Sequence, residues 1–222
     1  EFKDALEKTF VELRFFSDDR DSMEQKQRAI ACLLSVFWIC ADKYDMFVRE
    51  QGPDVRLTEE SWETLQTWTR DTVGLTDNAA TVGAALVAVA VVYLGKIEPF
   101  RKTFAPEYED HIEALASILQ KDPVLIPSFC KLEENLQQMV VSSVKADFNF
   151  GQFLQGENLP GSLETVRKIL QESSNCSSAN ILGNLLFRMF AALCAITGPA
   201  SLAGSLFMTD KMYNNFKVGL DV

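Results

Sequence analysis

The stretch "NILGNLLFRMFAALCAITGPASLAGSLFM" (residues 180–208) decides how this chain folds, because Arg188 is the one charged residue in it. It has three interpretations: a membrane span, a hairpin that inserts into membranes on a trigger, or the middle of a soluble helical bundle. A span needs about 20 consecutive apolar residues, and Gly198 and Pro199 interrupt the pattern near that length. An arginine near the bilayer centre costs about 2.5–3.5 kcal/mol on insertion scales, which favours the soluble core.

Helical spacing within the stretch supports the same interpretation. Asn184, Arg188 and Ala192 share one side of a helix, while Leu185 and Phe190 lie on the remaining surface. The helix therefore has a narrow stripe of polar and small residues and is otherwise apolar. A buried arginine requires a partner, so we expect Arg188 to pair with an acidic residue from another helix.

A second apolar stretch, residues 82–94, contains no charge and is rich in alanine and valine. Valine favours strands, which keeps a strand open as an alternative. The length of the stretch and its alanines favour a buried helix instead. The middle of another expected helix, over residues 22–49, is apolar nearly all round and should also lie centrally.

The rest of the chain also has helical periodicity. Further helices are predicted over residues 2–16, 58–74, 106–120, 126–145 and 163–172. The predicted fold is all-α: a single-domain multi-helix bundle of about eight to ten helices around one or two fully apolar central helices. It spans residues 1–222, which is long enough to bury a sizeable core. The chain does not begin with Met, so a fragment or one domain of a longer protein fits equally well.

The charge balance excludes some partners. The chain has 21 basic and 31 acidic residues and a formal net charge of −10, with no dense basic cluster. Such a surface repels phosphate backbones and anionic membranes, so we expect no nucleic-acid partner. Five cysteines without a C-x-x-C pair indicate a reduced, intracellular and most simply cytoplasmic protein, with no organelle indicated.

Catalytic and metal motifs are missing from the sequence. His111 is the only histidine, and there is no H-E-x-x-H, G-x-S-x-G, Walker or G-x-G-x-x-G pattern. We therefore expect no catalytic residues, no metal and no cofactor, although an unfamiliar carboxylate site stays open. Glu107 lies four residues before His111, and we interpret the two as an exposed pair on one helix face.

The segment "DFNFGQFLQGENLPG" (residues 147–161) is the most distinctive local pattern, because aromatic, amide and glycine residues alternate in it. It is either a structural corner or the rim of a small-molecule pocket or partner groove. The candidate ligand or partner residues are Phe148, Phe150, Gln152, Phe153, Gln155 and Arg188.

These observations predict a non-enzymatic helical module for protein–protein interaction, scaffolding or regulation, with another protein as its partner. The alternative is a binder of an apolar small-molecule ligand or cofactor in an inter-helix pocket, for which 16 Phe and 3 Trp supply aromatic surface. A third hypothesis is a helical hairpin that inserts into membranes conditionally, without a constitutive span.

Overall fold

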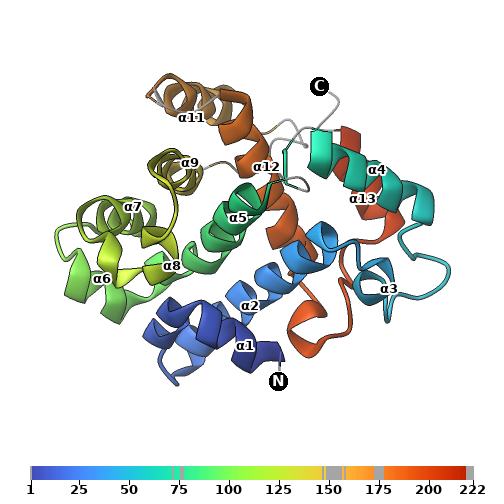
Figure 1. Ribbon diagram of the computed structural model, residues 1–222, viewed down its shortest axis with the longest axis horizontal. Coiled ribbons are helices and arrows are strands. Elements are labelled where there is room, and N and C mark those ends of the chain that lie inside the picture. The colour runs from blue at the N-terminus through green and yellow to red at the C-terminus, as the bar shows by residue number, and fades with distance from the viewer. Residues whose placement is uncertain are drawn as a thin grey trace.

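An apolar helix at the centre organises the computed structural model. This helix, α5 (Ala79–Val91), has no charged residue, and its second half is buried except for the partly buried Leu86. Figure 1 shows it in the middle of the molecule, and it contacts α2 (Arg20–Cys40), α9 (Glu134–Lys145) and α12 (Ser178–Cys194). A helix without a polar face must be covered by protein on every side, and these three neighbours provide that cover for α5. The structure describes residues 2–71, 73–75, 78–146, 148, 157, 159–172 and 178–218.

The described residues form twelve α-helices and no strand, which confirms the predicted all-α class and excludes a strand over residues 82–94. The remaining α-helices are α1 (Phe2–Thr9), α3 (Tyr44–Phe47), α4 (Glu59–Asp71), α6 (Glu98–Phe104), α7 (His111–Lys121), α8 (Pro127–Cys130), α11 (Leu159–Glu172) and α13 (Asp210–Val218). Four short 3-10 turns join them: η1 (Val11–Phe15), η2 (Leu94–Lys96), η3 (Pro123–Leu125) and η4 (Pro199–Ser201).

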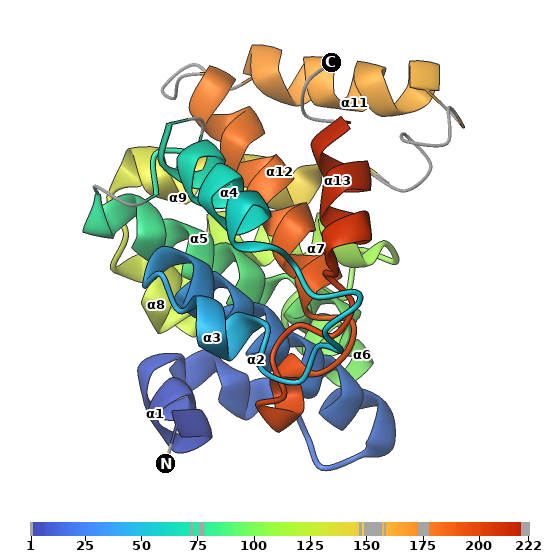
Figure 2. The same cartoon turned by 90° about the vertical axis from the view of Figure 1, so that its right-hand side faces the viewer.

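The outer helices cover this centre from several sides. Helices α4 and α13 contact each other on one flank, and α6, α7 and α8 lie on the opposite flank (Figure 1). Figure 2 shows α11 across one end of the molecule and α1 at the other end. The two long apolar stretches of the sequence, in α5 and α12, thus lie in the interior.

The stretch 180–208 packs as a core element. Ile181, Leu185, Phe187 and Phe190 of α12 are all buried. One helical stretch, Ala79–Lys96, is long and apolar enough to cross a membrane by length and composition, and 56% of it is buried inside the bundle. Packing against neighbouring helices accounts for the apolar character of both stretches.

Several predicted helices are interrupted. The helix expected over residues 22–49 ends at Cys40, because Asp42 takes a left-handed conformation (φ 51°) before α3 begins. The helix expected over residues 126–145 is divided into α8 and α9. The left-handed position that ends a helix is usually a glycine, but here it is Asp42. Residues 41–43 contain no glycine or proline, so the sequence does not indicate this break.

Helix α7 begins later than the sequence indicates. Its N-cap is Asp110, whose carboxylate accepts hydrogen bonds from the backbone N–H groups of Ile112 and Glu113, both at 2.9 Å. Glu107 is therefore outside the helix, and its carboxylate pairs with Lys121 at 3.2 Å. The prediction that Glu107 and His111 form a helical pair is wrong, because a stronger cap follows Pro106.

The N-termini of α4 and α13 are joined by one carboxylate. Thr58 caps α4, as its side chain accepts from the Ser61 N–H at 3.2 Å. Asp210, the first residue of α13, accepts from the Thr58 N–H (3.0 Å), the Thr58 hydroxyl (2.8 Å) and the Ser61 hydroxyl (2.6 Å). Partial burial opposes ionisation, but these hydrogen bonds prevail and lower the pKa of Asp210 below its ordinary 3.8.

We predict that Asp210→Asn lowers the free energy of unfolding at pH 7 by about 1–3 kcal/mol, because the charged acceptor is lost. The pKa of Asp210 is depressed on folding, so its stabilisation is present above the unfolded value of 3.8 and is lost as the pH falls through the lower folded value. Urea unfolding at pH 7 and at pH 3 measures both effects. Asp54→Asn, in an exposed loop, is the control; a difference that persists undiminished at pH 3 would contradict the prediction.

Gly204 allows the loop after α12 to approach α3 closely. Its φ is +84°, and an added Cβ would lie 2.5 Å from the Phe47 carbonyl oxygen and 2.8 Å from that of Met46. The same loop donates a hydrogen bond from the Ser205 N–H to the Phe47 carbonyl at 2.7 Å. Only a residue without a side chain fits this position.

Gly204→Ala is expected to lower the free energy of unfolding by about 2–3 kcal/mol, from backbone strain and the clash together. Gly74→Ala is the matched control, since Gly74 also has a positive φ (+69°) but has no atom within 4 Å of an added Cβ. Its cost should be about 1–2 kcal/mol. Equal losses in urea unfolding would show that the contact with α3 does not form.

Candidate functional site

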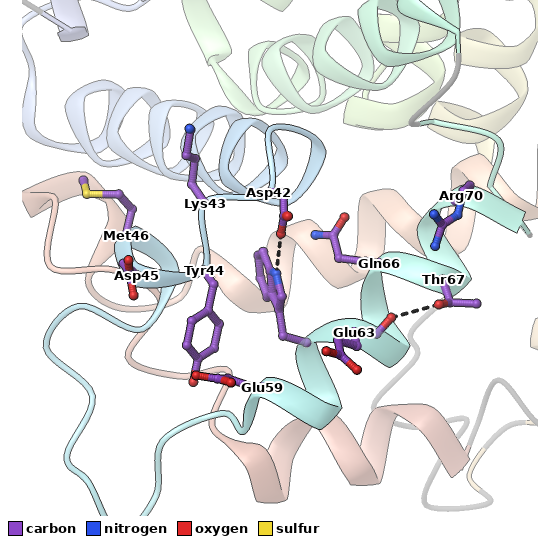
Figure 3. A pocket seen from close by; sticks show the side chains of 11 residues that line it. Asp42, Lys43, Tyr44, Asp45, Met46, Glu59, Glu63, Gln66, Thr67 and Arg70 are labelled. Carbon is purple, nitrogen blue, oxygen red and sulfur yellow. Dashed lines mark hydrogen bonds between the residues drawn. The ribbon is translucent and has the colours of Figure 1, made fainter.

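An open groove of about 930 Å³ lies between α3 and α4 (Figure 3). The turn after α2 and helix α3 form one wall, and the exposed face of α4 forms the other. The charged residues that line it are Asp42, Lys43, Asp45, Glu59, Glu63 and Arg70. With four acidic and two basic side chains, the groove has a negative lining.

Aromatic side chains form a fixed floor under these charges. The Trp62 indole donates to the Asp42 carboxylate at 2.7 Å, and the Tyr44 hydroxyl donates to the Leu57 carbonyl at 2.7 Å. The ring centroids of Tyr44 and Trp62 lie 5.7 Å apart, and those of Phe47 and Trp62 lie 5.1 Å apart. Burial and the Glu59 charge raise the pKa of Tyr44, so its hydroxyl stays protonated as a donor.

The groove is also anchored to the end of α2. The Gln66 amide of α4 donates to the Ile39 carbonyl at 2.8 Å, and this carbonyl also accepts from the Asp42 backbone N–H at 3.2 Å. The described residues contain no group of three His, Cys, Asp or Glu side chains arranged to hold a metal ion. Exposed carboxylates above a rigid floor can bind cationic groups by charge-assisted hydrogen bonds.

We predict that Asp42→Ala lowers the free energy of unfolding by about 1–3 kcal/mol, because it leaves the buried Trp62 N–H without an acceptor. Asp42→Asn is the matched control, since asparagine retains an acceptor and tolerates the left-handed backbone (φ 51°). Urea unfolding followed by tryptophan fluorescence measures both variants. Similar losses in the two variants would argue against the indole–carboxylate bond.

A second polar cluster surrounds Arg188 in the interior. Its Nε donates to the Ser143 hydroxyl at 3.0 Å, and one terminal nitrogen donates to the Ser143 carbonyl at 2.9 Å. The expected acidic partner is not found: among the described residues, no carboxylate lies within ion-pair distance of Arg188. Ser143 of α9 takes that place through a side-chain and a backbone oxygen.

Two further buried groups lie beside this cluster. The Cys32 thiol and the Tyr93 hydroxyl are 3.4 Å apart. Burial raises the pKa of Cys32 to about 11 and also raises the pKa of Tyr93. Both groups are therefore neutral near pH 7, and Cys32 is a poor nucleophile.

Neither Phe148 nor Arg188, the two predicted site residues that the structure describes, lines the groove. Phe148 is half-buried and packs against the core. Arg188 lies in the interior, and the predictions for Phe150, Gln152, Phe153 and Gln155 fall outside the described residues. Sequence reasoning missed Tyr44 and Trp62 as groove residues, although Tyr44 lies between two acidic residues in "DKYDM" (residues 42–46).

Fold and site together define an all-α protein with an open, acidic surface groove. Residues 19–181 match the model of a family described as a family of unknown function (DUF6829), and the chain belongs to that family. The match includes the whole groove and ends within α12, before Arg188. No curated protein and no solved structure matches the chain.

Proposed function

We propose that this chain is a non-enzymatic helical protein–protein interaction module whose α3–α4 groove receives a basic segment of a partner protein. The observation that carries the proposal is the groove itself, with exposed carboxylates over a floor that hydrogen bonds hold in place. A preformed site loses little conformational freedom on binding. Scaffolding and regulation are both compatible with this kind of site.

The carboxylates are placed to act together. Glu59 and Glu63 lie four residues apart on the same face of α4, and Asp45 lies on the opposite wall. All three are exposed, so pairing them with lysine or arginine requires little desolvation. Such contacts favour fast and selective association that weakens with salt.

The two alternative functions have less support. The cavities lined by described residues near α3, α6 and the start of α2 are open and carry charged side chains, unlike a pocket for an apolar ligand. A membrane-inserting hairpin would require α12 to leave its contacts with α2, α5 and α9. We keep both as hypotheses of lower rank.

An intracellular and most simply cytoplasmic location is part of the same proposal. Cys32, Cys40, Cys130 and Cys194 are free thiols, which is typical of proteins in a reducing compartment. The excess of acidic residues on the whole chain supports a protein partner with basic groups and disfavours nucleic acid.

The proposal predicts selective binding of cationic peptides. In fluorescence anisotropy at 50 mM NaCl, a lysine- and arginine-rich peptide should bind the full chain, and its glutamate-substituted counterpart should not. The double variant Glu59→Gln/Glu63→Gln should weaken binding of the basic peptide by about tenfold, equivalent to losing about 1.4 kcal/mol of binding free energy. Raising the salt to 300 mM should also weaken binding.

Glu98→Gln/Glu113→Gln is the matched control, because it removes the same charge from exposed positions that do not line the groove. It should leave the affinity within about twofold, since only distant, screened charge is lost. If both double variants weakened binding equally, net charge alone would explain the effect. If the acidic peptide bound as tightly as the basic one, the proposal would be refuted.

A further inference from the structure

The guanidinium of Arg188 is buried without an opposing charge among the described residues. Burial lowers the pKa of Arg188. Among the described residues, its side chain donates hydrogen bonds to Ser143 alone. A desolvated charge without a counter-ion is costly, and buried arginines ordinarily meet a carboxylate or a phosphate. The described residues supply neither, so nothing in the described part of the chain neutralises this charge.

Donor groups remain available beside this charge. A guanidinium has five N–H groups, and the two bonds to Ser143 use two of them. Arg188 is half-buried, so part of its side chain remains accessible to solvent. Its remaining N–H groups have no hydrogen-bond partner among the described residues.

Asn184 provides a second, independent observation. It precedes Arg188 by one helical turn on the same face of α12, and helical side chains lean toward the N-terminus, which brings the arginine over that turn. Asn184 is only 2% exposed, yet both polar atoms of its amide lack a hydrogen-bond partner in the part of the chain that the structure describes. Buried amides in native proteins are almost always satisfied, so these atoms point to a missing polar group.

Positive charge extends from this cluster to the surface. The Lys96 ammonium lies 5.5 Å from the centroid of the Tyr93 ring, and the Tyr93 hydroxyl meets Cys32. Partial burial, with the charges of Arg28 and Arg188, lowers the pKa of Lys96. Arg28 pairs with Glu24 at 2.6 Å, but Lys96 has no carboxylate within ion-pair distance among the described residues.

We propose that Arg188, Asn184 and Lys96 form a binding site for a small oxyanion, the phosphate or carboxylate group of a ligand. Arg188 offers parallel N–H donors to two anion oxygens, and Asn184 adds an amide donor at the inner end. Lys96 supplies positive potential at the surface and attracts the anion. The site is separate from the α3–α4 groove and does not depend on the function proposed for that groove.

Isothermal titration calorimetry on the full chain tests the site with two probes, inorganic phosphate and acetate, at pH 7.5 and constant ionic strength. We expect saturable binding of at least one probe, and the probe that binds identifies the ligand group. Lys96→Gln should weaken binding of that probe about tenfold, and Arg188→Gln should abolish the binding. Lys102→Gln is the matched control. It removes the same positive charge as Lys96→Gln, but from an exposed lysine that pairs with Glu98.

Thermal unfolding gives a second readout. A bound anion raises the unfolding temperature along a saturating curve, whereas general salt exclusion raises it without saturation. If Arg188→Gln fails to fold, Lys96→Gln still decides the question, because Lys96 is exposed. The proposal is overturned if neither probe binds saturably, or if Lys96→Gln and Lys102→Gln weaken binding equally.

Discussion

The burial of α5 is the constraint on which the rest of the structure depends. Its second half has no polar face, so its surface must be covered by protein. Helices α2, α9 and α12 provide that cover, and each brings polar groups into the interior with it. Ser143 and Arg188 are on two of these helices, and their mutual hydrogen bonds follow from the packing of α9 against α12.

Two polar regions therefore have opposite physical character. In the α3–α4 groove, the carboxylates of residues such as Glu59 and Glu63 are exposed to solvent. Around Arg188 burial desolvates the charge, and Asn184 has no hydrogen-bond partner among the described residues. The association proposed for the first region would be selective and salt-dependent, while the anion proposed for the second would supply the missing interactions.

The sequence predicts much of the fold and little of the groove. The helical class, the core position of residues 180–208 and the Thr58 cap follow from periodicity and local capping chemistry. The break at Asp42 and the later start of α7 do not, because they depend on a non-glycine left-handed residue and on the capping of α7 by Asp110. The groove depends on Trp62 meeting Asp42 across 20 positions of chain.

By itself, the sequence determined that the chain is an all-α protein with apolar central helices, because hydrophobic periodicity reports directly which faces of a helix must be buried. It also indicated that Arg188 lies within a core helix. Only the tertiary structure decided that Ser143, and no described carboxylate, meets that arginine, and that α3 and α4 enclose an acidic groove. Those pairings depend on how separate helices cross, which is set by the packing of whole faces and leaves no local pattern in the chain.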